Sequence, residues 1–481
     1  MEKSSSKELL RELPSAGFSV TVQLKLQNTP GTFARVVHYL GEAGASLAEV
    51  TLIYSDFNFL LREITINCVS EEGAKKVLEQ LPKLDGIELI EWRDDTMELH
   101  RGGKLEVVSH SLIHTTDELS RAYTPGVARV CNLIAADKEQ AFEFTIKGNT
   151  VGVVTDGSAV LGLGDIGPLA ALPVMEGKAA LFKQFAGLNA FPICLDTQDT
   201  EELIATIKNL APVFAGINLE DISAPRCFEI ENRLRDELDI PVFHDDQHGT
   251  AVVVLAGLIN ALKIVGKDLD KVKVVVNGFG AGGVACTRML LLAGVKNIVP
   301  CDRAGIVYRG RKERMNPVKD ELIELTNPEN EKGTVADALK GADVFIGVSQ
   351  PGVVNREMIQ SMAKEPIVFA LANPVPEIMP SEILDVAKVI ATGRSDFANQ
   401  VNNVLCFPGI FRGAIDCRAR DITEGMRLAA AHAIAEVISE EELHERYIIP
   451  SVFHGDVATR VAEAVRDQAI KEGVARTTDQ A

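Results

Sequence analysis

The stretch 272–302, VKVVVNGFGAGGVACTRMLLLAGVKNIVPCD, decides the fold of the larger part of this chain. An apolar run at 272–276 predicts a buried strand, a helix is expected over 284–293, and a second strand over 298–301 ends at Asp302. The glycine-rich turn before the helix consists of Gly278, Phe279, Gly280, Ala281, Gly282 and Gly283. Such glycines let the backbone approach a pyrophosphate at a helix N-terminus, and an acidic residue about 20 positions later can bind a ribose. The segment therefore predicts a dinucleotide site.

The same glycine pattern occurs a second time, at 162–167. That copy has no acidic residue at the required distance and runs into Pro168, so we expect it to form a loop. The Rossmann-type site at 272–302 should take NAD or NADP. Asp302 disfavours the 2′-phosphate of NADP, whereas Arg303 beside it could bind one, so the sequence favours NAD only slightly.

Around this segment, strand-like apolar runs alternate with helical ones from about residue 107 onward. Alternation of this kind predicts an α/β fold, with parallel sheets that carry helices on both faces. Near the end of the chain, apolar residues recur at helical spacing over 426–438 and 457–470. We therefore expect an α/β catalytic domain (105–250), a Rossmann-type nucleotide domain (251–418) and C-terminal helices (419–481).

Residues 14–95 form a separate pattern of strand, helix, two strands, helix and strand. This βαββαβ order predicts a ferredoxin-like unit. The Thr29-Pro30-Gly31 turn before its first helix and Gly44 after that helix resemble the ACT family of small regulatory domains. The resemblance implies that the unit binds a small effector, and a purely structural role in dimerisation is the alternative.

Composition and charge limit the classes of function that this chain can have. The net charge of −19 and the pI near 5.0 argue against nucleic acid and anionic membranes as partners. Residues 1–13 do not resemble a signal peptide, and no apolar run approaches the roughly 18 residues of a membrane span. The eight cysteines are scattered without a CxxC pair, which indicates reduced thiols and a cytoplasmic protein.

Two acidic pairs follow apolar segments: Glu220-Asp221 after 213–219 and Asp245-Asp246 after 240–243. Either pair alone could be a solvated loop or a helix cap. Together they can meet where parallel strands end, and carboxylates with open positions suit Mg²⁺ or Mn²⁺. His244 and His248 flank the second pair, but neither their spacing nor any thiolate supports zinc.

Several motifs, in order, resemble the malic enzyme family of the shorter prokaryotic type, here with an ACT-like unit in front. They cover about residues 105–460 and comprise Tyr123-Thr124-Pro125-Gly126-Val127, Glu176-Gly177-Lys178-Ala179-Ala180, Leu219-Glu220-Asp221, His244-Asp245-Asp246-Gln247-His248-Gly249-Thr250, Ala372-Asn373-Pro374, Asn402-Asn403-Val404 and Phe407-Pro408-Gly409.

This resemblance implies a role for each matching residue. Tyr123 would be the general acid, and Lys178 the general base, with a pKa lowered towards about 7–8. Glu220, Asp221 and Asp246 would bind the metal, with Asp245 beside them. Asn373 would contact the cofactor and Asn403 the substrate. Larger family members carry an arginine that binds a substrate carboxylate where this chain has Ala159-Val160, and Arg394 is the candidate replacement.

The implied reaction is the metal-dependent oxidative decarboxylation of malate to pyruvate, with reduction of NAD or NADP, by a homo-oligomer (dimer or tetramer). Two alternatives remain open. An amino-acid dehydrogenase would also combine a Rossmann domain with a catalytic lysine, but would need no metal. A dinucleotide-sensing regulatory protein would have no use for two acidic pairs at an open metal site.

Overall fold

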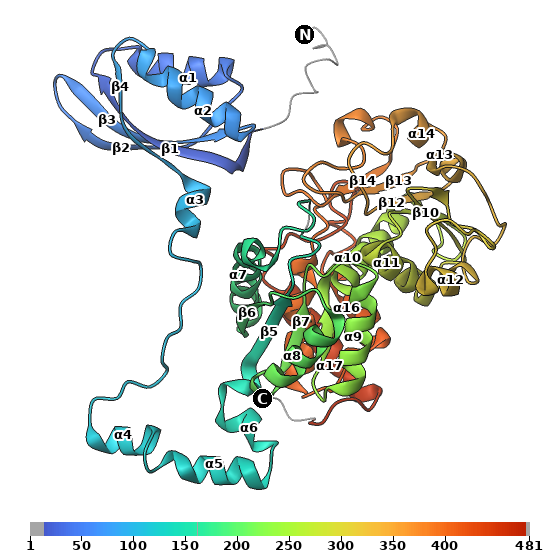
Figure 1. Cartoon of the computed structure of the whole chain (residues 1–481). Helices are drawn as coiled ribbons and strands as arrows, with labels where there is room; N and C mark the ends of the chain where they lie inside the picture. The colour runs from blue at the N-terminus through green and yellow to red at the C-terminus, as the bar shows by residue number, and fades with distance from the viewer. Residues whose placement is uncertain (1–13, 161, 478–481) are drawn as a thin grey trace. The chain divides into compact units, whose positions relative to one another are not determined.

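A computed structural model describes residues 14–160 and 162–477, which form two compact units, Met1–Glu106 and Val107–Ala481 (Figure 1). Residues 1–13, on which the prediction about a signal peptide rests, lie outside the described part of the chain.

The first unit has the βαββαβ order that the sequence predicts. Its elements are β1 (Ser15–Gln27), α1 (Thr32–Glu42), β2 (Ser46–Ser55), β3 (Phe59–Cys68), α2 (Glu71–Gln80) and β4 (Ile87–Asp94), followed by the short α3 (Asp95–His100). The strands form an antiparallel sheet in the order β2-β3-β1-β4. Gly44 takes a left-handed φ of 72° just after α1, which explains why a glycine ends that helix.

The second unit contains two sheets, and the first of them is entirely parallel. Its strands run in the order β6-β5-β7-β8. They are β5 (Thr150–Thr155), β6 (Asn189–Cys194), β7 (Gly216–Leu219) and β8 (Val242–His244), and the connecting helices are α7 (Pro168–Ala186), α8 (Thr200–Leu210) and α9 (Arg226–Glu237). Because the strands are parallel, the residues that follow β7 and β8 meet at one edge.

The second sheet is the predicted Rossmann-type layer, with the order β11-β10-β9-β12-β13-β14. All its pairings are parallel except that of the short β11 with β10. The strands are β9 (Lys273–Asn277), β10 (Asn297–Asp302), β11 (Gly305–Ile306), β12 (Val344–Gly347), β13 (Ile367–Ala370) and β14 (Val389–Thr392), and the helices are α11 (Ala281–Leu292), α12 (Pro317–Ile323), α13 (Val335–Leu339) and α14 (Arg356–Gln360).

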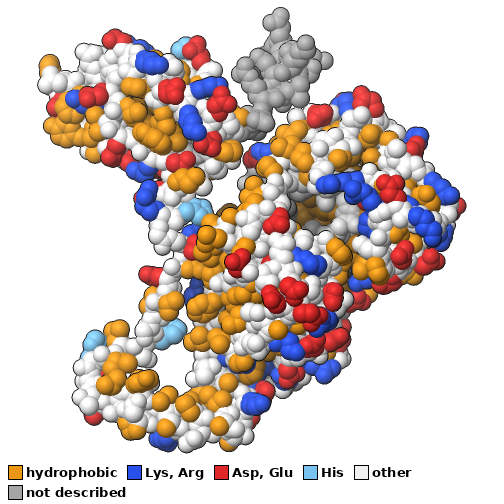
Figure 2. Space-filling model, viewed as in Figure 1, with side chains coloured by type: hydrophobic (Ala, Val, Ile, Leu, Met, Phe, Trp, Pro, Cys, Tyr) orange, Lys and Arg blue, Asp and Glu red, His pale blue; other side chains and the backbone are white. Residues whose placement is uncertain are grey.

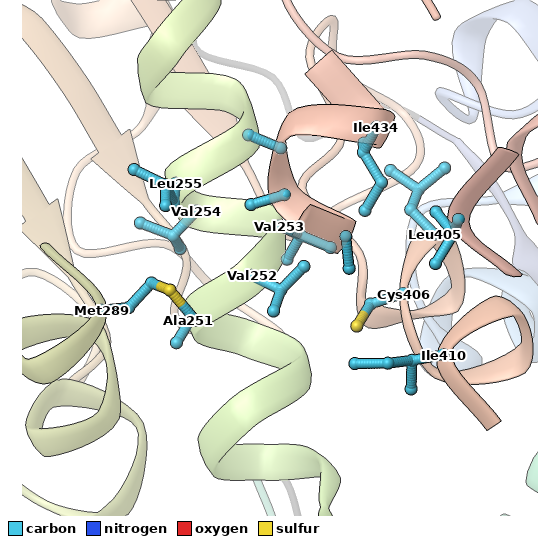
Figure 3. Close-up of a cluster of buried hydrophobic side chains, with 14 of the residues drawn as sticks. Ala251, Val252, Val253, Val254, Leu255, Met289, Leu405, Cys406, Ile410 and Ile434 are labelled. Atoms are coloured by element: carbon cyan, nitrogen blue, oxygen red, sulfur yellow. The ribbon is translucent and has the colours of Figure 1, made fainter. Parts of the chain in front are cut away.

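One long helix, α10 (Asp245–Val265), lies in the largest apolar core. Figure 3 shows its side chains from Ala251 to Leu255 between Met289 of α11 and Leu405, Ile410 and Ile434 of the C-terminal segments. By length and composition α10 could cross a membrane, but 67% of its apolar window is buried inside the fold. The expectation that no segment approaches that length is corrected here, because a core helix can be just as apolar.

The C-terminal helices are α15 (Phe407–Asp416), α16 (Glu424–Ala435) and α17 (Val457–Lys471). They pack around α10 and α7 as one core. Phe182 of α7, for example, makes edge-on contacts with Phe407 and Phe411. These aromatic contacts hold α7, which carries Lys178, against the C-terminal part of the chain.

At the start of the second unit, three helices are different. They are α4 (Thr116–Ala122), α5 (Val127–Ala136) and α6 (Gln140–Phe144), and none of them buries a residue. We call residues 107–136 the arm. Within this unit, Figure 1 shows α4 and α5 standing clear of the β5–β8 sheet.

Candidate active site

The four acidic residues meet at the carboxyl ends of β7 and β8. Leu219 pairs with His244 in the parallel register, so Glu220-Asp221 and Asp245-Asp246 leave the sheet side by side. One oxygen each from Glu220, Asp221 and Asp246 can be chosen so that all lie within 4.8 Å of one another. The backbone N–H of Asp221 also donates to the Asp246 carboxylate at 2.8 Å. The structure thus brings together the three residues for which the sequence suggested a metal.

Local backbone geometry supports this cluster. Asp221 has a φ of 54°, in the left-handed region that a residue other than glycine occupies at a cost of about 1–3 kcal/mol. Asp245 and Asp246 stand in the first turn of α10, where the helix dipole stabilises negative charge. His244, not an aspartate, occupies the N-cap position and makes no side-chain cap. The capping interpretation therefore does not explain the second acidic pair.

Lys178 projects from α7 into the same cluster. Its ammonium lies 2.5 Å from an Asp245 oxygen and 3.1 Å from a Glu220 oxygen, over the ring of Phe407 at 4.1 Å. Asn403 donates to the same Asp245 oxygen at 2.7 Å. Asp245 therefore holds both Lys178 and Asn403, which makes it a positioning group in the centre of the site.

The carboxylates around Lys178 determine the direction of its pKa shift. Burial disfavours its charge, but the carboxylates of Asp245 and Glu220 outweigh burial and hold its pKa above the ordinary value. Burial raises the pKa of Glu220 well above its usual range, although Lys178 opposes the shift. The predicted lowering of the lysine pKa depends on a bound cation, and with the carboxylates alone as neighbours the Lys178 pKa shifts upward.

Gly249 is a site residue that the sequence reasoning missed. A Cβ at this position would lie 1.9 Å from an Asp245 oxygen and 3.1 Å from the Cβ of Asn403. Only a glycine at this position leaves room for the Asp245 carboxylate, which belongs to the first residue of the same helix, one turn earlier. Gly249 lies inside the motif 244–250, but only the fold shows which neighbouring atoms occupy the space that a side chain would need.

Polar residues next to the acidic cluster also contact one another, and Glu231 of α9 lies at their centre. Glu231 accepts hydrogen bonds from the His244 N–H at 3.2 Å and from Gln247 at 3.1 Å, and it lies 2.7 Å from a ring nitrogen of His248. Burial and the nearby Arg427 lower the pKa of His248 to about 4. Neither histidine belongs to the candidate metal cluster that the described residues form.

The predicted glycine turn lines an open cavity of about 880 Å³. Gly278 has a φ of 106°, and a Cβ there would lie 2.4 Å from the Val348 carbonyl oxygen. A Cβ on Gly283 would lie 2.2 Å from the carbonyl oxygen of Gly278. These glycines are therefore needed for the tight path from β9 into α11, at whose N-terminus a pyrophosphate could bind.

Asp302 ends β10 at the rim of this cavity, but its carboxylate is already engaged. It accepts hydrogen bonds from the Ala304 N–H at 2.9 Å, from Lys319 at 2.7 Å and from Arg311. Burial would raise the pKa of Asp302, yet these two cations hold it below its usual value. A ribose bound in this cavity would face a carboxylate whose negative charge is already balanced by cations. Lys319 and the exposed Arg303 also line the cavity beside that carboxylate.

We expect Asp302→Ser to weaken NAD binding about tenfold and NADP binding less, because it removes a charged acceptor and exposes Lys319 and Arg311 to a 2′-phosphate. Titration calorimetry with each nucleotide would measure both affinities. Arg303→Ser is the matched variant and should weaken NADP binding alone. Equal losses of both nucleotides in Asp302→Ser would show that Asp302 does not distinguish them.

The other predicted residues lie in three different settings. The second glycine pattern is a loop before α7, as expected, and a Cβ on Gly162 would lie 2.9 Å from the carbonyl oxygen of Asn373. Asn373 is not among the residues that line the nucleotide cavity. The guanidinium of Arg394 binds Asp396 at 2.7 Å and the Pro374 carbonyl at 3.0 Å, so it is not free to grip a substrate.

Tyr123 is the one predicted catalytic side chain that the structure leaves outside the cluster. It follows α4, and 69% of it is exposed. Lys178 contacts Glu220, Asp245 and Phe407. The residues predicted as general acid and general base are therefore not in contact in this structure.

Comparison with known proteins agrees with this geometry. The family model "Malic enzyme, N-terminal domain" matches residues 102–235, and "Malic enzyme, NAD binding domain" matches residues 247–470. An NAD-dependent malic enzyme of Geobacillus stearothermophilus is 56% identical over 461 residues, which cover 96% of each chain. A bifunctional malic/malolactic enzyme of Bacillus subtilis is 55% identical and covers 80% of this chain and 95% of that protein.

Solved structures show the same relationship. The malic enzyme of Pyrococcus horikoshii has a TM-score of 0.77 at 50% identity, over 80% of this chain and 92% of that one. The NAD-dependent malic enzyme of Thermotoga maritima has a TM-score of 0.76 at 50% identity, over 78% and 99%. On this evidence, the chain belongs to the malic enzyme family.

Proposed function

We propose that this chain oxidises malate with NAD or NADP and decarboxylates the product to pyruvate and CO₂. The observation that carries the proposal is the cluster at the ends of β7 and β8, where Lys178 lies between Asp245 and Glu220. High identity to malic enzymes over almost the whole chain supports the same activity. Both alternatives are less favoured: a dehydrogenase without metal would not need the acidic cluster, and a sensor would not need the buried lysine.

The donor set fits Mg²⁺ or Mn²⁺, because Glu220, Asp221 and Asp246 offer three hard oxygen ligands within reach of one ion. When bound, such an ion would polarise the C2 oxygen of malate and offset the carboxylate charge that raises the Lys178 pKa. Asp245 does not belong to this set. We assign it the role of holding Lys178 and Asn403 in place.

Two side chains would transfer protons at different carbon atoms of the substrate. Lys178 takes the proton from the C2 hydroxyl, for which its position inside the cluster suits it. Tyr123 gives a proton to C3 after CO₂ has left. Asn403, which Asp245 orients, would contact the substrate, and Asn373 the nicotinamide end of the cofactor.

We propose that the second unit consists of a catalytic domain (105–250), a nucleotide domain (251–418) and C-terminal helices (419–481). The cytoplasm is the proposed location, where all eight cysteines, which are free in this structure, would stay reduced. NAD is slightly favoured over NADP, as Asp302 suggests.

The N-terminal unit is proposed to be an ACT-like regulatory domain, because its element order and antiparallel sheet suit that family. The relative from Geobacillus stearothermophilus aligns over nearly the whole chain, which includes this unit. The Bacillus subtilis relative aligns with 80% of this chain at similar identity. An N-terminal unit is thus compatible with the family without being needed for it.

Removal of residues 1–95 is expected to leave the basal rate within about twofold, because no proposed catalytic group lies there, and to remove any response to small effectors. Steady-state rates of the full and truncated chains, with amino acids and organic acids as test effectors, would show this. An effector response that persists after truncation would place regulation elsewhere.

The decisive test of the activity is malate-dependent reduction of NAD and of NADP, with EDTA and then with excess Mn²⁺. We expect turnover that EDTA abolishes and Mn²⁺ restores, with pyruvate as product. Turnover of an amino acid that EDTA does not affect would favour the dehydrogenase. Nucleotide binding without turnover of either substrate would favour the sensor.

A further inference from the structure

A further cavity of the second unit is distinct from the nucleotide cavity and from the acidic cluster. It has a volume of about 160 Å³ and lies between α9, α10, α11, α12 and α16. It shares no lining residue with the nucleotide cavity, and none of the three proposed metal ligands lines it. Pockets for drug-sized ligands have roughly 300–1,000 Å³, so this cavity suits a ligand of only a few heavy atoms.

The cavity is lined by an arginine that the fold buries without pairing all of its donors. Arg427 of α16 is 6% exposed, and its Nε has no hydrogen-bond partner among the described residues. One terminal nitrogen contacts the ring of His248, and the other lies 3.9 Å from the largely exposed carboxylate of Glu424. A buried guanidinium has five N–H groups, and each one left unpaired costs free energy. Arg427 can therefore donate to an acceptor that enters the cavity.

The charge of Arg427 is poorly balanced inside the protein. Burial lowers the pKa of its guanidinium, and Glu231 and other carboxylates oppose that shift without reversing it. Glu231 is itself engaged, since it lies 2.7 Å from a ring nitrogen of His248 and accepts a hydrogen bond from Gln247. A negative charge brought close would stabilise the guanidinium. An anion in the cavity would supply the charge that the fold does not.

The other arginines around the cavity are already paired. Arg288 lies 3.0 Å from Glu321, which also lines the cavity. Arg235 donates two hydrogen bonds to Asp421, at 2.9 and 2.7 Å. Figure 2 shows acidic and basic side chains mixed over the face of the second unit that carries α8 and α9. Selection of an anion therefore depends on the buried Arg427 and not on the charge of the surface.

Apolar side chains form much of the remaining wall. They are Phe228 of α9, Val284, Met289 and Leu292 of α11, and Val318 of α12. Water needs two to four polar partners, which these side chains do not offer, whereas an organic molecule would bury their apolar surface. The cavity thus combines one charged donor with apolar walls.

From these contacts we infer that the cavity binds a small organic acid, whose carboxylate pairs with Arg427 and whose short apolar chain lies against Phe228 and Met289. Arginine and a carboxylate form strong, charge-assisted hydrogen bonds, and the apolar chain adds the burial that an inorganic anion cannot. Because the inference concerns binding alone, it goes beyond the proposed function and does not rest on it.

Butyrate is a suitable probe of this site. The full chain would be titrated with it by saturation-transfer NMR at constant ionic strength, with EDTA present so that no divalent metal offers the carboxylate another site. We expect saturable binding. Butyramide, which has the same shape without the charge, and phosphate, which has charge without the chain, should each bind at least about tenfold more weakly. Butyramide or phosphate that binds as well as butyrate, or butyrate that does not bind, would overturn the inference.

Two matched pairs of variants locate the binding. Arg427→Met removes the charge and keeps an unbranched chain, so it should weaken butyrate binding at least about tenfold. Arg460→Met changes an exposed arginine of α17 and should leave binding unchanged. Wild-type affinity in Arg427→Met, or the same loss in both variants, would contradict the assignment of Arg427.

The second pair keeps Arg427 and changes only exposed leucines, so the fold is not at risk. Leu292 lines the cavity and is 41% exposed, whereas Leu384 lies elsewhere in the nucleotide domain and is 64% exposed. Leu292→Glu places a carboxylate at the cavity that repels the ligand and competes for the guanidinium, so butyrate binding should weaken about tenfold. Leu384→Glu should bind like the wild type. Equal affinities in these two variants would show that butyrate binds outside this cavity.

Discussion

Glu220→Gln or Asp246→Asn is expected to reduce malate turnover by roughly 10²–10³-fold or more while nucleotide binding survives. Each change replaces a charged oxygen ligand by a neutral amide of nearly the same shape, so packing is kept and affinity for a divalent ion is lost. The nucleotide cavity should be unaffected, because it is built on the other sheet. Rates over a Mn²⁺ titration and binding of NADH by fluorescence would separate the two effects.

The control is Glu229→Gln, which changes a carboxylate of the same domain on the exposed side of α9. It should retain the wild-type rate and the wild-type Mn²⁺ dependence. If either cluster variant turned over malate at the wild-type rate, the metal assignment would be wrong. A loss of NADH binding together with activity would instead point to misfolding.

The parts of this site that sequence predicts are those set by local pattern and by sheet topology. Strand β9, the glycine turn and α11 follow from an apolar run, glycines and helical spacing within 30 residues. The meeting of Glu220 with Asp246 follows because both come directly after parallel strands, and neighbouring parallel strands end at one edge.

Contacts between distant segments could not be predicted in this way. Asp302 has the position of a ribose acceptor, yet Arg311 and Lys319 bind it from a segment with no periodic signal. Likewise, the pKa of Lys178 depends on its distances to Asp245 and Glu220, which only the tertiary fold sets, because Lys178 lies on α7 and the two carboxylates follow β8 and β7. The motif around Tyr123 suggests a role, but Tyr123 is exposed and follows α4, which stands clear of the β5–β8 sheet (Figure 1).

Lys178→Ala and Tyr123→Phe are expected to fail at different steps. Removal of the lysine takes away the acceptor of the C2 hydroxyl proton, so malate oxidation should fall by about 10²–10⁴-fold. Lys183→Ala is the matched control, because that lysine lies on the same helix, is exposed and donates a hydrogen bond to Asn189. It should keep the wild-type rate.

Tyr123→Phe keeps the ring and removes only the phenolic proton, so oxidation of malate should persist while the enolpyruvate formed after loss of CO₂ waits for a proton at C3. Oxaloacetate separates the two roles, because it enters after the oxidation step. With oxaloacetate, Lys178→Ala should decarboxylate more nearly like the wild type than it does with malate, whereas Tyr123→Phe should release enolpyruvate that converts to pyruvate at the slower solution rate. Ultraviolet absorbance of the enol and NMR of deuterium incorporation at C3 would follow this conversion. Wild-type conversion by Tyr123→Phe would remove Tyr123 from the acid role and leave Lys178 or water as the donor.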